Sequence, residues 1–127
     1  MKQIIHTDDA PAAIGPYAQA VRAGNTLYLS GQIPIDPATG KVVEGNIREQ
    51  TEQVMKNIGA VLRAAGGDYA NVVKSTCLMA DMNDFAAMNE VYGSYYVENP
   101  PARAAFEVAR LPLDVLVEIE TIAVLDS

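Results

Sequence analysis

Short apolar runs separated by turn signals predict β-strands, and the run at residues 72–80 is rich in β-branched side chains. The predicted strands span residues 2–6, 18–22, 26–30, 72–80, 103–109 and 115–125. Ala23-Gly24-Asn25 separates the second strand from the third and predicts a hairpin connection. Residues 36–40 (DPATG) predict a tight turn, because proline fixes φ and glycine permits a positive φ.

A longer stretch between the third and fourth strands has helical spacing instead. Asn46 is placed to cap this helix, Glu49 occupies the capping-box position, and Gly66-Gly67 ends the helix. The residues that share one helical face are Ile47, Thr51, Val54, Met55, Ile58, Val61, Leu62 and Ala65.

A second predicted helix follows an N-cap signal at residues 81–84 and must end before Pro100-Pro101. Its inner face is rich in aromatic residues and consists of Phe85, Met88, Tyr92, Tyr95 and Tyr96. The element order is strands, helix, strand, helix and two strands. This order predicts an α+β fold in which both helices cover one face of the sheet.

The last predicted strand places two carboxylates on one face. Glu118 and Glu120 lie roughly 7 Å apart there, between aliphatic neighbours, and an exposed sheet face would explain them as well as a functional site. If strand 103–109 forms a hairpin with the last strand, Arg103 approaches these carboxylates at the same sheet surface. Arg103 would then form a buried ion pair with one of them or bind a carboxylate or phosphate ligand in bidentate fashion.

Composition excludes several classes of protein. Half of the 127 residues are apolar and the net charge is −7, which predicts one ordinary globular domain, residues 1–127, and argues against nucleic-acid binding. The chain has one cysteine and one histidine, too few for a disulfide or a zinc cluster. Cys77 lies in the middle of a predicted strand, where a buried and inert thiol is expected. Neither a signal peptide nor a membrane span is predicted, so the expected location is the cytoplasm.

Five stretches of the chain together resemble a known family. They are APAAIGPYAQAV (10–21), LYLSGQIPIDPATG (27–40), NVVKSTCLMADMNDFAAMNEVY (71–92), PPARAAFEVARLP (100–112) and VEIETIAV (117–124). They closely resemble the Rid family, the YjgF-type group of reactive intermediate deaminases, and most of all its RidA branch. The resemblance covers essentially the whole chain.

The resemblance implies a chorismate-mutase-like subunit that forms a homotrimer around a central β-barrel, with active sites between neighbouring subunits. It implies no cofactor and no metal, while the net charge of −7 predicts no nucleic-acid partner and the lack of a long apolar stretch predicts no membrane partner. Family members hydrolyse small 2-enamino and 2-imino acids, such as 2-aminoacrylate and 2-iminopropionate, to 2-oxo acids and ammonia. The expected activity is therefore that of a 2-iminobutanoate/2-iminopropanoate deaminase. A non-catalytic protein that binds small carboxylates for regulation is the alternative, and RNA cleavage, also attributed to the family, is a third reading.

The family motifs also imply roles for three residues. Arg103 matches the arginine of the PAR motif and would bind the substrate carboxylate. Glu118 matches the first glutamate of EIE and would hold and polarise the attacking water. Tyr17 would close the pocket or relay a proton. Glu120 would raise the pKa of Glu118 and Arg103 would lower it, and the sequence leaves open which effect is larger.

Four further positions match the family's substrate pocket, namely Ser30, Gly31, Asn89 and Ala105. Glycine beside a polar residue at a strand end allows a ligand to approach the main chain, although ordinary turn chemistry also explains such a glycine. Ala105 stands where many bacterial members carry cysteine, so any contact from this position must come from its backbone.

Overall fold

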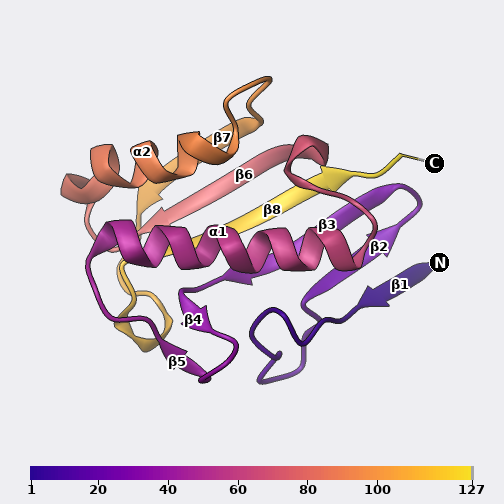
Figure 1. The fold of residues 1–127 in the computed structure, drawn as a ribbon, viewed down its shortest axis with the longest axis horizontal. Helices are drawn as coiled ribbons and strands as arrows, with labels where there is room; N and C mark the ends of the chain where they lie inside the picture. The colour runs from indigo at the N-terminus through magenta and orange to yellow at the C-terminus, as the bar shows by residue number, and fades with distance from the viewer. Residues whose placement is uncertain (127) are drawn as a thin grey trace.

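Six strands form one mixed sheet, and both helices lie on the same face of it (Figure 1). The computed structural model describes residues 1–126. The strands of the main sheet are β1 (Lys2–Ile5), β2 (Ala20–Ala23), β3 (Thr26–Gln32), β6 (Val72–Met79), β7 (Ala102–Glu107) and β8 (Val117–Val124). The helices are α1 (Ile47–Ala64) and α2 (Phe85–Tyr95), and a small ribbon pairs β4 (Ile35–Asp36) with β5 (Lys41–Val42). The predicted α+β fold with both helices on one sheet face is confirmed.

The strand order is β1-β2-β3-β8-β6-β7, so β8 lies in the interior of the sheet and β7 at its edge. All neighbours are antiparallel except β6 and β7, which are parallel and connected through α2. The expected hairpin of the last two strands is therefore wrong. Strand β6 lies between them. At the end of β6, Ala80 N–H donates to Leu116 O, just before β8, and Val108 N–H, just after β7, donates to Met79 O.

Helix α1 begins as its sequence predicts. The Asn46 side chain accepts a hydrogen bond from Arg48 N–H at 3.0 Å, and Asn46 N–H donates to the Glu49 carboxylate at 2.8 Å. This capping box satisfies backbone donors that the first helical turn leaves unpaired. The helix ends before Gly66, whose φ of +89° favours glycine.

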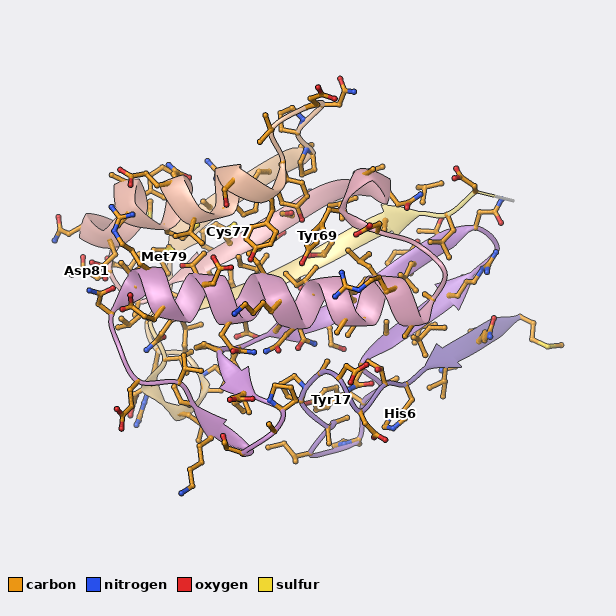
Figure 2. The ribbon with its side chains drawn as sticks, in the orientation of Figure 1. His6, Tyr17, Tyr69, Cys77, Met79 and Asp81 are labelled. Carbon is orange, nitrogen blue, oxygen red and sulfur yellow. The ribbon has the colours of Figure 1, made fainter. Side chains whose placement is uncertain are left out.

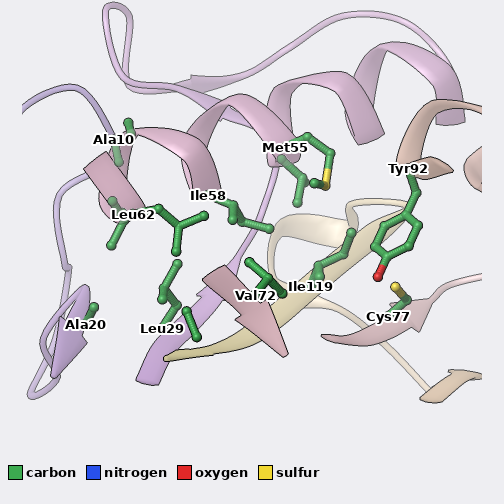
Figure 3. Packing of buried hydrophobic residues seen from close by; sticks show 14 of the residues in the cluster. Ala10, Ala20, Leu29, Met55, Ile58, Leu62, Val72, Cys77, Tyr92 and Ile119 are labelled. Atoms are coloured by element: carbon green, nitrogen blue, oxygen red, sulfur yellow. The ribbon is translucent and has the colours of Figure 1, made fainter. Parts of the chain in front are cut away.

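The hydrophobic core fills the space between the helices and the sheet (Figure 3). Strand β8 alternates as predicted: Val117, Ile119, Thr121 and Ala123 are buried on the helix side. We call this side of the sheet the helix face and the opposite side the open face. Glu118 and Glu120 lie on the open face, where Tyr28 and Phe106 are about half exposed. No helix among residues 1–126 is both long and apolar enough to cross a bilayer.

Candidate functional site

Arg103 lies on the helix face of the edge strand β7, beneath α2. It is paired in register with Ser75 of β6, and its Nη1 donates a hydrogen bond of 2.6 Å to Asn89 Oδ1. Its guanidinium carbon also lies 5.2 Å from the ring centroid of Phe85 and 5.1 Å from that of Tyr92. The guanidinium is exposed, yet three side chains of α2 hold it in place. The family resemblance gave Asn89 as a pocket position, whereas the contacts of Arg103 with the two rings were not predicted.

Ala105 follows two residues later on the same face of β7 and is paired in register with Cys77. The Cys77 thiol is fully buried, as expected, and faces the Tyr92 ring (Figure 3). Burial raises the pKa of this thiol to about 11, and the nearby positive charge of Arg103 only partly opposes the shift. The thiol is therefore protonated at neutral pH, and the thiolate that nucleophilic chemistry requires is scarce.

Glu118 lies on the open face, where β8 passes a bulge in β3. Leu29 pairs with Thr121 and Gln32 with Ile119, so Ser30 and Gly31 both fall opposite Glu120. A Cβ atom built on Gly31 would lie 2.9 Å from Glu118 Cδ, which is too close for a real side chain. Gly31 is thus needed to make room for the Glu118 carboxylate. Burial raises the pKa of this carboxyl and the charge of Glu120 raises it further.

Tyr17 lies in the loop between β1 and β2, and its side chain is half exposed. Together with Gly31 and three isoleucines it lines a cavity of about 240 Å³; the isoleucines are Ile14, Ile33 and Ile35. Ser30 holds this loop, because its hydroxyl donates to Ala18 O at 2.6 Å and its N–H donates to Gln19 O at 3.0 Å. Ser30 therefore supports the cavity wall that carries Tyr17.

Gln19 is a structural residue that the sequence reasoning did not single out. Its side chain is buried and accepts from Thr7 N–H at 2.8 Å, while its amide donates to Thr7 O at 3.0 Å and Pro11 O at 2.8 Å. These bonds tie residues 7–11 to the start of β2, so that Pro11 helps to line the cavity. A glutamine at the start of a predicted strand, among apolar neighbours, was the only signal in the sequence.

The predicted site residues thus fall into two groups within one chain. Arg103, Asn89 and Ala105 form the arginine group under α2, whereas Glu118, Gly31 and Tyr17 form the glutamate group. Figure 2 shows Tyr17 far from Cys77, the neighbour of Ala105. Strand alternation separates the groups, because Arg103 is level with Ser75 on the helix face and Glu118 with Leu78 on the open face.

The two ion-pair expectations for Arg103 are wrong for the part of the chain described, residues 1–126. Neither Glu118 nor Glu120 forms a salt bridge with this arginine, whose hydrogen-bond partner is the neutral amide of Asn89. The physical reason is the insertion of β6 between β7 and β8. Over the same residues, no group of three His, Cys, Asp or Glu side chains is arranged to hold a metal ion.

Chemically, the arginine group is a receptor for an anion, because an exposed guanidinium offers planar N–H donors to a carboxylate. The glutamate group offers a base with a raised pKa beside an apolar cavity. The two groups become complementary only if one substrate contacts both of them.

The chain is similar to several known proteins. The family model described as Endoribonuclease L-PSP matches residues 7–125. A mouse protein named 2-iminobutanoate/2-iminopropanoate deaminase is 52% identical over 98% of this chain and 92% of its own. The crystal structure of RidA from an Antarctic Psychrobacter is 50% identical, with a TM-score of 0.93, and covers 97% of this chain and 99% of its own.

A further solved structure is that of E. coli TdcF with bound serine. It is 42% identical to this chain, has a TM-score of 0.92, and covers 98% of this chain and 99% of its own. The family model and these relatives match nearly the full length of the chain. The chain therefore belongs to the Rid family, the YjgF or L-PSP group that includes the RidA proteins.

Proposed function

We propose that this protein is a 2-iminobutanoate/2-iminopropanoate deaminase, which hydrolyses short 2-imino acids and their enamine tautomers to 2-oxo acids and ammonia. The observation that carries the proposal is that Arg103 is held in place without an acidic partner in the described part of the chain. It is exposed, held by a neutral amide and two ring faces, and free of an acidic partner among residues 1–126. Such an arginine is ready to bind a substrate carboxylate. Relatives about half identical over the full chain carry this activity in their names.

The working unit in this proposal is a homotrimer with a chorismate-mutase-like subunit and a central β-barrel formed by the open faces of three sheets. Two features support it. Arg103 and Glu118 lie on opposite faces of one sheet, so a substrate small enough to be a 2-imino acid needs Arg103 from one subunit and Glu118 from another. Apolar side chains on the open face, including Tyr28, Phe106 and Val124, are also left about half exposed by the single chain.

The proposed reaction is R–C(=NH)–COO⁻ + H₂O → R–CO–COO⁻ + NH₃. Arg103 binds the carboxylate in a bidentate pair and so orients the C=N carbon. A water held by Glu118 gives a proton to the Glu118 carboxylate and adds to the C=N carbon, forming a tetrahedral carbinolamine. Protonation of the nitrogen then allows ammonia to leave as the carbonyl forms. General base catalysis of this kind contributes about 10²–10⁴ in rate.

The remaining residues have supporting roles in this mechanism. The raised pKa of Glu118 makes its carboxylate a stronger base than an exposed glutamate. Tyr17 closes the cavity or relays the proton to nitrogen. Ser30 and Gly31 shape the wall on the glutamate side, while Asn89 and the backbone of Ala105 belong to the arginine side. Water and these side chains supply every step, so the proposal requires no cofactor or metal.

The test couples a threonine dehydratase to the protein and follows the appearance of 2-oxobutanoate. We expect Arg103→Ala to abolish the acceleration, and Arg103→Lys to fail nearly as badly because an ammonium lacks the planar two-point fork. Arg110→Ala is the matched control, since Arg110 is exposed and paired only with Asp114 among residues 1–126. Wild-type rates in Arg103→Ala would refute the mechanism.

The same purified proteins also distinguish deamination from two other functions, carboxylate binding without catalysis and RNA cleavage. If the protein only binds carboxylates, calorimetry with 2-oxobutanoate detects binding while the coupled assay shows no acceleration. The description of the family model as an endoribonuclease favours RNA cleavage. The net charge of −7 opposes RNA binding, and ribonuclease activity that disappears on further purification would exclude it.

A further inference from the structure

One face of α2 presents three residues to Arg103, spaced at i, i+4 and i+7: Phe85, Asn89 and Tyr92. We propose that Phe85 and Tyr92 are positioning residues, whose ring faces fix the guanidinium of Arg103 so that it can bind a carboxylate without being neutralised. This inference rests on the proposed function for its biological meaning but can be tested without it.

The rings are themselves anchored. Tyr92 is buried, packs at a tilt of 50° against Tyr96 with ring centroids 4.9 Å apart, and points its hydroxyl end toward Cys77, while Phe85 is half-buried against the hydrophobic core. Residues at these spacings lie on the same side of a helix, so one rigid element carries all the contacts. Arg103 lies on an edge strand, where only one side is covered by a neighbouring strand. The helix therefore supplies the restraint that the sheet lacks.

The chemistry of the contacts preserves the arginine's capacity to bind. A ring face attracts a guanidinium through its quadrupole and uses none of its N–H donors. Asn89 accepts one N–H from Nη1 and carries no charge, so the remaining donors and the full positive charge stay available. A carboxylate in the place of Asn89 or of either ring would compete with the ligand for the N–H donors of the Arg103 guanidinium. The arrangement thus orders a long, flexible side chain before the ligand arrives, which lowers the entropic cost of binding.

The first experiment titrates 2-oxobutanoate into wild-type protein, Tyr92→Leu and Tyr92→Phe by calorimetry. We expect Tyr92→Leu to raise Kd roughly 3- to 30-fold, the range of one cation–π contact, and Tyr92→Phe to keep the wild-type value because the ring face remains. Phe85→Leu provides a second ring deletion in case Tyr92→Leu does not fold. Asn89→Asp should also weaken binding, because the new carboxylate neutralises the fork. A wild-type Kd in both leucine variants, or equal losses in Tyr92→Phe and Tyr92→Leu, would overturn the proposal.

A second readout needs neither ligand nor activity. The Nε–Hε resonance of Arg103 should be shifted upfield by ring currents and show a high order parameter in the free wild-type protein. Phe85→Leu and Tyr92→Leu should each reduce both properties, whereas Tyr92→Phe should retain them. Arg110, which has no ring partner among residues 1–126, is the internal control. If the coupled assay shows no deamination but these signals behave as expected, the proposed function fails and the positioning role stands; a mobile Arg103 in wild-type protein refutes the positioning role alone.

Discussion

At the scale of single residues, the contact between Gly31 and Glu118 shows how a missing side chain creates a site. The backbone of Gly31 does not have a positive φ, so conformational strain does not explain the glycine. What requires it is space, since the Glu118 carboxylate occupies the position of a Cβ. The bulge at Ser30 and Gly31 brings the two residues together.

Gly31→Ala should therefore displace the Glu118 carboxylate and reduce kcat at least tenfold, with only a small loss in the free energy of unfolding, because the displaced group is the flexible end of a side chain. Urea denaturation measures the second quantity. In a Glu118→Ala background the same substitution should cost almost nothing, because the clash is gone. Gly93→Ala is the control: it has open space around it within α2 and should gain about 0.5–1 kcal/mol. A wild-type kcat in Gly31→Ala would contradict the steric explanation.

The pKa of Glu118 predicts the pH dependence of the reaction. A base acts in its ionised form, so kcat/KM should rise with pH through a pKa that burial and Glu120 hold above the usual glutamate value. Glu120→Gln removes the like charge, lowers the pKa of Glu118 and should move the acidic limb of the profile to lower pH. Arg103 is unchanged in both proteins, so the difference reports the charge of Glu120. Glu98→Gln, in the exposed loop after α2, should leave the limb in place; a limb that does not move in Glu120→Gln would exclude the like-charge effect.

At the scale of elements, the two helices differ in how they begin. Asn46 forms a complete capping box on α1, whereas Asp84 precedes α2 without a side-chain capping bond. Asn46→Ala should lower the free energy of unfolding by about 1 kcal/mol, measured by urea denaturation, because the backbone N–H of Arg48 loses its side-chain acceptor. Asp84→Ala, the matched control, should cost less, since only the favourable interaction of a charge with the helix dipole is lost. Equal losses would mean that the capping box adds nothing.

The sheet is the element that keeps the two site groups apart. In a strand, successive side chains point to opposite faces, and a one-residue difference in register decides which face a residue occupies. Arg103 is level with Ser75 and Glu118 with Leu78, three residues further along β6. An odd difference places the two side chains on opposite faces. The proposed mechanism therefore needs a second copy of the chain to complete the site.

At the scale of the whole molecule, the proposed shared site predicts complementation between two inactive variants. Arg103→Ala and Glu118→Ala should each be inactive alone. Unfolded together in equal amounts and refolded, they should regain about a quarter of the wild-type activity per site, because one in four ordered neighbour pairs joins an intact Arg103 to an intact Glu118. Refolding each variant alone is the control. No recovery, from mixtures whose oligomers are shown to be mixed, would place both residues' functions within one chain.

The local sequence pattern was sufficient to predict the helices and strands and to predict which side chains of β8 are buried. The capping box of Asn46, the glycine stop at Gly66 and the alternation of β8 all depend on residues close in sequence, and each was predicted correctly. Such features are legible because hydrogen bonds within a turn and the two-residue period of a strand do not depend on what the element packs against.

Strand pairing, in contrast, was decided only by the tertiary structure. The sequence allowed β7 and β8 to form a hairpin, but α2 carries the chain to the far side of β6 and makes β7 a parallel edge strand. This strand order depends on burying the apolar faces of both helices over one sheet, and no local segment of the sequence specifies that packing. Because β7 pairs with β6, Arg103 lies away from Glu118 and contacts the rings of Phe85 and Tyr92, while Glu118 lies on the open face. The sequence alone was enough to name the candidate site residues; the long-range packing decided which of them can meet within one chain.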